Sequence, residues 1–188
     1  MQREDLEHII CAAAALTKES DFIIIGSQAI LGQYPDAPQA LRVSMEADIY
    51  PRDRPELADQ IDGSLGMDSP FDATFGYHAD GVSPGTATLP NGWTRRLTPI
   101  CNANTNGATG WCLEVHDLAI AKYAAGREKD LRYTAALLNA GYLDPATLDQ
   151  RLRDTAIDHE VRNLIAARIR RDQARRRDSD RRPGDQDG

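Results

Sequence analysis

The sequence predicts an α+β fold in which a small mixed sheet is flanked by helices and followed by a helical region at the carboxyl end. Residues 3–17 have apolar side chains at helical spacing, residues 22–25 form a continuous apolar run rich in β-branched side chains, and residues 43–50 alternate as a strand does. Residues 117–140 and 145–170 have helical patterns. We expect a core over residues 1–115, a helical region over 116–172 and a basic, disordered tail over 173–188.

Composition indicates a globular, cytoplasmic protein. A length of 188 residues, of which 41% are hydrophobic, is enough to bury a core. The apolar stretch near the amino end is far shorter than the roughly 20 residues of a membrane span, and the acidic start is unlike a secretory signal. We therefore expect no membrane partner. The net charge of −7 argues against broad non-specific binding of duplex nucleic acid, although the Arg-rich residues 162–188 could contact phosphates or decorate a solvated helix.

Cysteine and histidine usage argues against a zinc site or a disulfide framework. The three cysteines show no C-x-x-C spacing, and the four histidines are scattered without the spacing of metal ligands. We therefore expect no metal site built from histidine side chains.

The first helix leads into a strand and a glycine turn. Residues 22–25 have the pattern of a strand that is buried on both faces. Gly26 ends this strand, and Ser27 is predicted to be the N-cap of a helix that begins at Gln28. A strand, turn and helix in this order aim free backbone N–H groups at the turn.

The second strand places two carboxylates on one face. A loop over residues 33–38 precedes it, and Pro51 ends it. Within residues 43–50, alternate side chains point to opposite faces of a strand, so Glu46 and Asp48 share a face.

The remaining elements follow from periodicity and from turn residues. Residues 55–66 have a helical pattern, and residues 71–112 carry many turn residues between short apolar segments, which favours antiparallel strands. Residues 117–140 form the clearest helical region, Gly141 stops it, and a further helix covers 145–170. The short strands are expected at 75–77, 86–89, 96–100 and 111–113.

The glycine turn and the acidic strand predict a phosphate and metal site together. Carboxylates two apart on one strand face can converge on a hard cation, so Glu46 and Asp48 are candidate ligands of Mg²⁺ or Mn²⁺. Gly26 lets the backbone approach a phosphate, and Ser27 adds a hydroxyl donor. Each motif alone is common, and an E-x-D strand often only faces solvent. Their pairing favours the site.

These residues resemble the polymerase-beta-like nucleotidyltransferase superfamily, whose signature is a Gly-Ser turn followed by a strand with acidic-x-acidic. Arg42-x-Ser44-x-Glu46-x-Asp48 looks like the R-x-T-x-D-x-D strand of AbiEii-type enzymes, the toxins of type IV toxin–antitoxin systems. Residues 113–131 resemble the helix of that group that carries an essential lysine and, further on, an R-x-K-D acidic residue. There is also a similarity to small bacterial nucleotidyltransferase-like proteins. The fold implied is a mixed sheet of nucleotidyltransferase type.

The resemblance implies roles for the matching residues. Glu46 and Asp48 would hold the metal, the Gly-Ser turn would bind nucleotide phosphates, and Lys122 would bind or neutralise a phosphate. Asp48, Lys122 and Asp130 are the catalytic candidates. On one regular helix, Lys122 and Asp130 are about 80° apart and could border one cleft. The alternative is a solvated Lys122 and surface ion pairs.

Three departures from the family pattern bear on the site. Eighteen residues separate Ser27 from Glu46, which predicts a loop extruded around residues 35–38. Glu46 stands where Asp is commoner. The third carboxylate, which would activate the acceptor hydroxyl, is not evident, and Glu114 and Asp80 are the two candidates.

The resemblance implies transfer of a nucleoside monophosphate from an NTP to an acceptor hydroxyl. The acceptor could be RNA, such as a tRNA end, or a protein side chain, with a cognate antitoxin as partner in a toxin–antitoxin or phage-defence pair. A small-molecule acceptor remains open. The alternative is a catalytically degenerate nucleotidyltransferase fold that binds nucleotide or a partner protein without turnover.

Overall fold

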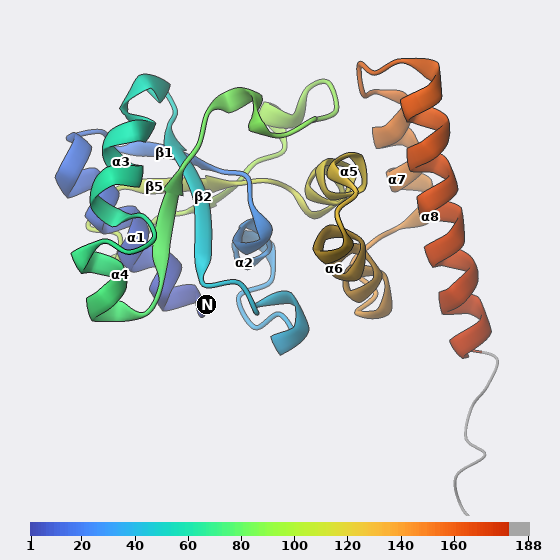
Figure 1. The fold of residues 1–188 in the computed structure, drawn as a ribbon, viewed down its shortest axis with the longest axis horizontal. Helices are drawn as coiled ribbons and strands as arrows, with labels where there is room; N and C mark the ends of the chain where they lie inside the picture. The colour runs from blue at the N-terminus through green and yellow to red at the C-terminus, as the bar shows by residue number, and fades with distance from the viewer. Residues whose placement is uncertain (181–188) are drawn as a thin grey trace, which may run out of the picture.

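The computed structural model describes residues 1–180, in which a five-stranded sheet lies between helices and a stack of further helices stands beside it (Figure 1). This arrangement confirms the predicted α+β class. The strands are β1 (Asp21–Ile24), β2 (Glu46–Pro51), β3 (His78–Gly81), β4 (Thr98–Ile100) and β5 (Thr109–Cys112). The helices are α1 (Arg3–Thr17), α2 (Ile30–Gln33), α3 (Ala58–Leu65), α4 (Pro70–Phe75), α5 (Val115–Ala125), α6 (Glu128–Asn139), α7 (Pro145–Arg153) and α8 (His159–Asp180).

The sheet is mixed, and its strands lie in the order β3-β2-β1-β5-β4. β1 pairs antiparallel with β2, where Ile24 aligns with Ile49, and parallel with β5. β2 pairs parallel with β3, and β4 antiparallel with β5. Because β1 and β2 run in opposite directions, the end of β1, which leads into Gly26, meets the beginning of β2. The glycine turn and the acidic strand are thereby brought together.

The two faces of the sheet are covered differently. Helices α1, α2 and α3 pack on one of them, where Ile10 of α1 lies against Gly110 of β5, Gly32 of α2 lies against Cys112, and α3 lies against Gly81 of β3. The buried side chains Leu6, Ile9 and Ile10 of α1 belong to the core under the sheet, and no part of any of them is exposed. Alternate residues of β2, Ala47 and Ile49, are fully buried as well. The opposite face of β2 is therefore left for polar side chains.

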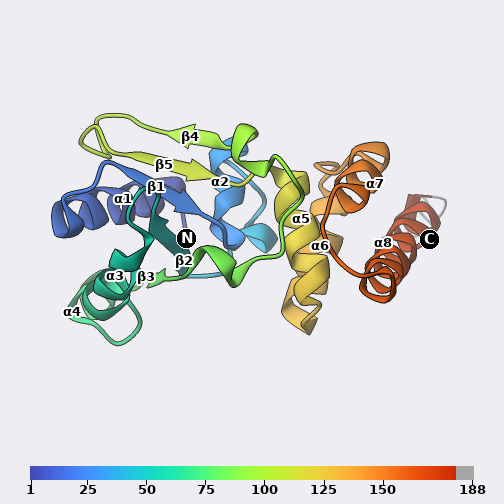
Figure 2. The ribbon, with the colours of Figure 1, turned by 90° about the horizontal axis from the view of Figure 1, so that it is seen from above.

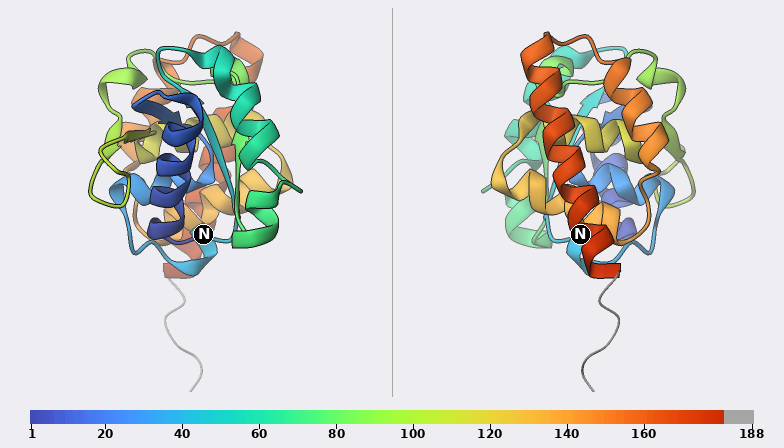
Figure 3. Two further views of the ribbon diagram at one scale, coloured as in Figure 1. Left: turned by 90° about the vertical axis from the view of Figure 1, so that its left-hand side faces the viewer. Right: turned by 90° about the vertical axis from the view of Figure 1, so that its right-hand side faces the viewer.

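Helix α5 is the centre of the carboxyl-terminal stack. It contacts α6, α7 and α8, and its Leu118, Ile120 and Tyr123 are fully buried. Its apolar side chains point in several directions, so neighbouring helices cover it on several sides. Seen from above, α5 and α6 lie between the sheet and the pair α7 and α8 (Figure 2). Figure 3 shows α8 running along the outer side of this stack.

The single helix expected over residues 117–140 is two helices in the structure. α5 ends at Gly126, whose φ of 65° is a left-handed cap that ends a helix and that glycine adopts without strain. The chain restarts as α6 two residues later. The helix expected over 145–170 is likewise divided into α7 and α8. Residues 173–180, expected to be disordered, are the last turns of α8, and residues 181–188 lie outside the described residues.

The segment 71–112 differs most from expectation. Residues 71–75 belong to α4, where Ser69 caps the helix by accepting from the Asp72 N–H, so the strand expected at 75–77 was wrong. β3 follows and is parallel to β2 instead of antiparallel, because α3 and α4 form a crossover between them. Residues 87–89 lie in no helix or strand. The expected antiparallel pair is confirmed as β4 and β5.

No helix within residues 1–180 is both long and apolar enough to cross a membrane.

Candidate functional site

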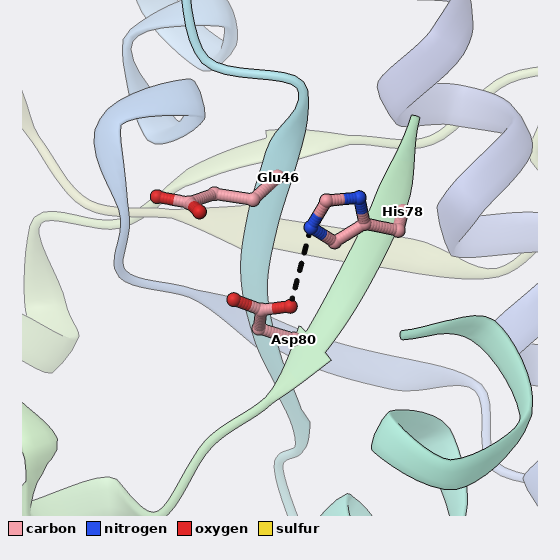
Figure 4. A group of neighbouring side chains, drawn as sticks. All are labelled: Glu46, His78 and Asp80. Carbon is pink, nitrogen blue, oxygen red and sulfur yellow. Dashed lines mark ion pairs between the residues drawn. The ribbon is translucent and has the colours of Figure 1, made fainter. Parts of the chain in front are cut away.

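Two parallel strands build a polar array on the face of the sheet away from α3. The register of β2 and β3 sets Glu46 opposite His78 and Asp48 opposite Asp80. Since side chains of the same parity share a face, all four project on one side. Three of them, Glu46, His78 and Asp80, are drawn in Figure 4. One ligand atom from each of these three lies within 4.8 Å of the other two.

The glycine turn fits closely against the fourth member of the array. A Cβ on Gly26 would lie 1.7 Å from Oδ2 of Asp48. Only glycine therefore allows this carboxylate to occupy its position. There are thus two reasons for a glycine at position 26. One is the predicted close approach of a phosphate to the backbone, and the other is the space that the Asp48 carboxylate needs.

The predicted cap at Ser27 was wrong. Gly26 occupies the N-cap position, and Ser27 begins the short 3-10 helix η1 (Ser27–Ala29) that precedes α2. The turn is held from the helical stack, because the Tyr133 hydroxyl of α6 donates to the Ser27 carbonyl oxygen at 2.6 Å. The Ser27 side chain is half-buried and lines a cavity beside Glu46.

Lys122 and Asp130 meet although no regular helix joins them. The Lys122 Nζ lies 3.4 Å from Oδ1 of Asp130, and the Arg127 Nε donates to Oδ2 at 2.7 Å. The Asp130 side chain is only 1% exposed, so these two cations satisfy a buried carboxylate. Lys122 also lies over the Tyr133 ring, 5.7 Å from its centroid. Asp130 thus orients Lys122 and Arg127 instead of facing the array.

Electrostatics separate the acids of the array from Asp130. Burial raises the pKa of Asp48, and the neighbouring charges of Glu46 and Asp80 raise it further, while Lys122 opposes them. Burial also raises the pKa of Asp80, with Glu46 adding to the rise and His78 opposing it. Burial alone would raise the pKa of Asp130 too, but the Arg127 hydrogen bond and the Lys122 charge hold it below its usual value. The array has an excess of negative charge, which a cation would relieve.

Two cavities flank β2. The larger, of about 570 Å³, is lined by Ser27, Glu46, Lys129 and Tyr133 together with the apolar side chains of Ala40, Leu41 and Val43. The smaller, of about 70 Å³, is lined by Gly26, Asp48, Lys122 and Arg127 with neighbouring residues. The array therefore opens on one side to a mostly apolar hollow and on the other to two cations.

The donor set of the array fits a divalent cation. It offers three carboxylates and one imidazole, and burial together with the neighbouring carboxylates raises the pKa of Asp48 and of Asp80. The ligands that would hold such an ion are Glu46 and Asp80, whose oxygens are already close, with Asp48 at their side. Glu46 is also paired with Lys129, whose Nζ lies 3.5 Å from its Oε1 on the exposed side.

The structure separates the two candidates for the third carboxylate. Asp80 lies directly beside Asp48 on the neighbouring strand. Glu114 caps α5 by accepting from the His116 and Asp117 N–H groups, and it does not belong to the array. Arg42 lies before β2, where its side chain contacts Gln2.

The long segment between the turn and the acidic strand is accommodated without disturbing their pairing. Gln28 donates from Nε2 to the Ser44 carbonyl oxygen at 3.0 Å, and Leu41 is almost completely buried. The register of β1 and β2 is unbroken. The expected extrusion around residues 35–38 therefore leaves both strands in place.

Residues 4–176 match a family model described as "Nucleotidyltransferase of unknown function (DUF6036)". Curated proteins and solved structures give no match. The matched segment begins in α1 and ends in α8, so it contains the whole array, the glycine turn and Lys122.

Proposed function

Since the chain belongs to this family of nucleotidyltransferases, we propose that it transfers a nucleoside monophosphate from an NTP to an acceptor hydroxyl, with Mg²⁺ or Mn²⁺ as cofactor. The observation that carries the proposal is the convergence of Glu46, Asp48 and Asp80 beside the Gly26 turn, with Lys122 lining the same cavity as Asp48. Buried carboxylates with raised pKa values, here Asp48 and Asp80, cluster at functional sites. The alternation of β2 explains only two of the three acids; β3 supplies the third.

In the proposed reaction, an acceptor oxygen bonds to the α-phosphorus of the NTP as the bond from that phosphorus to the bridging oxygen breaks. Pyrophosphate leaves, and the acceptor proton passes to a carboxylate, for which Asp80 is the best placed. A bound divalent cation would neutralise charge on the phosphates. Lys122 is expected to do the same from the opposite side, and Asp130 holds it there.

The Gly-Ser turn and the larger cavity suit the two ends of the nucleotide. We expect the turn, with Gly26 and Ser27, to lie against the phosphates. The mostly apolar cavity lined by Ser27 and Tyr133 is large enough to hold part of a nucleoside, since ligand pockets commonly begin at about 300 Å³. The AbiEii-type resemblance is the support for the acceptor, which would be tRNA, another RNA or a protein side chain. It is also the support for the biological setting, a toxin with a cognate antitoxin.

The competing proposal is a degenerate fold that binds nucleotide or a partner protein without turnover. The position of Asp80 weighs against it, because the third carboxylate that turnover needs stands beside Asp48. The two proposals differ in a single product, which is pyrophosphate.

The test is label transfer from each α-³²P-labelled NTP in the presence of Mg²⁺ or Mn²⁺. Total cellular RNA and a protein extract serve as separate acceptors, and released pyrophosphate is measured in parallel. We expect labelled acceptor with the wild type and a loss of at least about 100-fold in Asp48→Asn, since the substitution removes a charge that stabilises the transition state. The matched control is Asp149→Asn on the exposed side of α7, which should retain full activity. NTP binding without label transfer or pyrophosphate release would support the degenerate fold.

A further inference from the structure

His78 is a buried imidazole with an unsatisfied nitrogen. The whole His78 residue is 8% exposed, and its side chain is 10% exposed. The Nε2 atom is buried and has no hydrogen-bond partner within the described part of the chain. Figure 4 shows this nitrogen pointing toward Asp80, whose Oδ1 lies 3.5 Å away. A buried polar atom without a partner costs free energy, so its retention calls for an explanation.

The other ring nitrogen is fixed by Asp72. The His78 Nδ1 lies 3.2 Å from Oδ1 of Asp72, a hydrogen bond in which the ring donates. Asp72 is itself held at the start of α4, because its second oxygen accepts from the Asp68 N–H at 3.1 Å. A ring that donates from Nδ1 to a carboxylate keeps its lone pair on Nε2, where it is free to bind a metal.

The register of the strands brings Nε2 to the carboxylates. Glu46 is the Cα partner of His78, and Asp80 is two residues further along β3 on the same face. One ligand atom from each of these three residues lies within 4.8 Å of the others. Three ligands of two chemical types therefore converge on one small volume.

We propose that His78 is a ligand, through Nε2, of a divalent cation that it holds together with Glu46 and Asp80, and that this site takes Mn²⁺ or another first-row transition ion in preference to Mg²⁺. This proposal rests on the proposed function only in the expectation that the array binds a cation. What it adds to that function is a further ligand, His78, and the class of ion that the site prefers.

The preference follows from the ligand types. Mg²⁺ binds oxygen ligands and surrenders its water reluctantly, whereas an imidazole nitrogen suits softer transition ions. A site with two carboxylates and one imidazole therefore discriminates between the two classes. Asp72 strengthens this by orienting the ring, as outer partners of metal-binding histidines do. The proposal departs from the expectation that no metal site is built from histidine side chains; no sequence pattern indicated it, because the ligands come from two strands and have no regular spacing in the chain.

An alternative role for His78 is a protonated ring that bridges Asp72 and Asp80. In that case Nε2 would carry a proton and would not bind a metal. The two roles predict opposite results when a paramagnetic ion is added.

The test uses Mn²⁺ binding to the purified full chain, followed by electron paramagnetic resonance. Room-temperature spectra count free Mn²⁺ during a titration, and low-temperature electron spin echo modulation detects nitrogen bound to the ion. We expect the wild type to bind one Mn²⁺ whose signal shows ¹⁴N modulation. The Mn²⁺ bound to His78→Gln should show no ¹⁴N modulation. The Mn²⁺ affinity should fall about 10- to 100-fold in this variant, as is typical for disturbed metal sites. Competition of Mg²⁺ with Mn²⁺ measures the Mg²⁺ affinity of both proteins. Between the wild type and His78→Gln this affinity should change less than threefold, which corresponds to a binding free energy difference of at most about 0.6 kcal/mol.

The control is His159→Gln, an exposed histidine at the start of α8, which should leave both the modulation and the affinity unchanged. The wild-type spectrum can overturn the proposal by itself, even if His78→Gln does not fold. Absence of Mn²⁺ binding, or bound Mn²⁺ without ¹⁴N modulation, would overturn the proposal. So would equal modulation in the wild type and a folded His78→Gln protein.

The outcomes also separate this proposal from the proposed function. Label transfer without nitrogen modulation leaves the nucleotidyl transfer intact and removes the histidine ligand. Nitrogen modulation without label transfer in any acceptor assay keeps the metal site and removes the enzyme proposal.

Discussion

At the scale of single residues, the site depends on a position that has no side chain. Asp48 Oδ2 occupies the space that a Cβ on Gly26 would need, at 1.7 Å. We predict that Gly26→Ala displaces the Asp48 carboxylate and destabilises the fold by about 1–3 kcal/mol, as overpacked core positions do. Urea-induced unfolding measures the stability, and label transfer measures the activity, which should fall with it.

Gly63→Ala is the matched control for this substitution. Gly63 lies in α3 with no atom within 4 Å of an added Cβ. Alanine in a helix is favoured over glycine by up to about 1 kcal/mol, so this variant should be as stable as the wild type or more so. If the Gly26→Ala protein has wild-type stability and activity, the prediction is wrong, because the Asp48 carboxylate can then move without loss of either.

Part of the site could be predicted residue by residue, and part could not. Glu46 and Asp48 were found because strand alternation alone places them on one face. Asp80 and His78 join them only through the register of β3 beside β2, which no local pattern encodes. Tyr133 reaches the Ser27 carbonyl oxygen from a helix more than 100 residues away in the chain, and nothing in the spacing announces that contact.

At the scale of elements, a carboxylate ties α1 to the segment between β4 and β5. Glu7 is 4% exposed and accepts hydrogen bonds from the side-chain amides of Asn102 at 2.8 Å and Asn104 at 2.7 Å, and from Arg3 at 2.9 Å. Burial would raise its pKa, but these donors hold it below its usual value. The segment 101–107, which has no strand of its own, is thus tied to α1 by the Glu7 side chain.

The lowered pKa of Glu7 predicts a pH dependence of stability. Its contribution is fully present above the unfolded pKa, near 4.5, and is lost as the pH falls through the lower folded pKa. We predict that Glu7→Gln costs about 2 kcal/mol of unfolding free energy at pH 7, since hydrogen bonds to a charged group are lost. The difference from the wild type should shrink steadily below pH 4.5. Urea unfolding at several pH values measures both.

Glu4→Gln provides the control, because Glu4 is exposed on the same helix. It should change stability by less than about 0.5 kcal/mol. A destabilisation of Glu7→Gln that does not vary between pH 7 and acid pH would show that packing, and not the charge, gives Glu7 its effect.

Elements with strong periodicity could be predicted and those decided by tertiary contacts could not. α1, β1 and β2 lie within a few residues of their expected bounds, because each has a regular apolar pattern. α4 was missed although Ser69, Pro70 and Asp72 form an ordinary helix start, since its apolar residues suggested a strand. The division between α5 and α6 depends on the left-handed Gly126, which a helical pattern on both sides conceals.

At the scale of the whole molecule, ligand binding should appear as added stability. A ligand that binds only the folded state stabilises it by about 2.7 kcal/mol at 100 times its dissociation constant. We predict that an NTP analogue with a non-cleavable α,β bridge, added with Mn²⁺, raises the melting temperature of the wild type. Chelation of the metal with EDTA should reverse the rise.

Asp48→Asn should show little or no rise under the same conditions, whereas Asp149→Asn should behave as the wild type. Differential scanning calorimetry gives both temperatures and shows whether unfolding stays a single transition. Equal rises in all three proteins would place the ligand away from the array.

The hydrogen bond from Tyr133 to the Ser27 carbonyl oxygen has a thermodynamic consequence for any ligand of the turn. A loop that must be ordered by its ligand loses conformational entropy on binding, and the affinity falls accordingly. Here the turn is already held by the helical stack, with Tyr133 almost completely buried. The turn of the proposed nucleotide site is therefore preorganised, and we expect little of a ligand's binding free energy to be spent on ordering it.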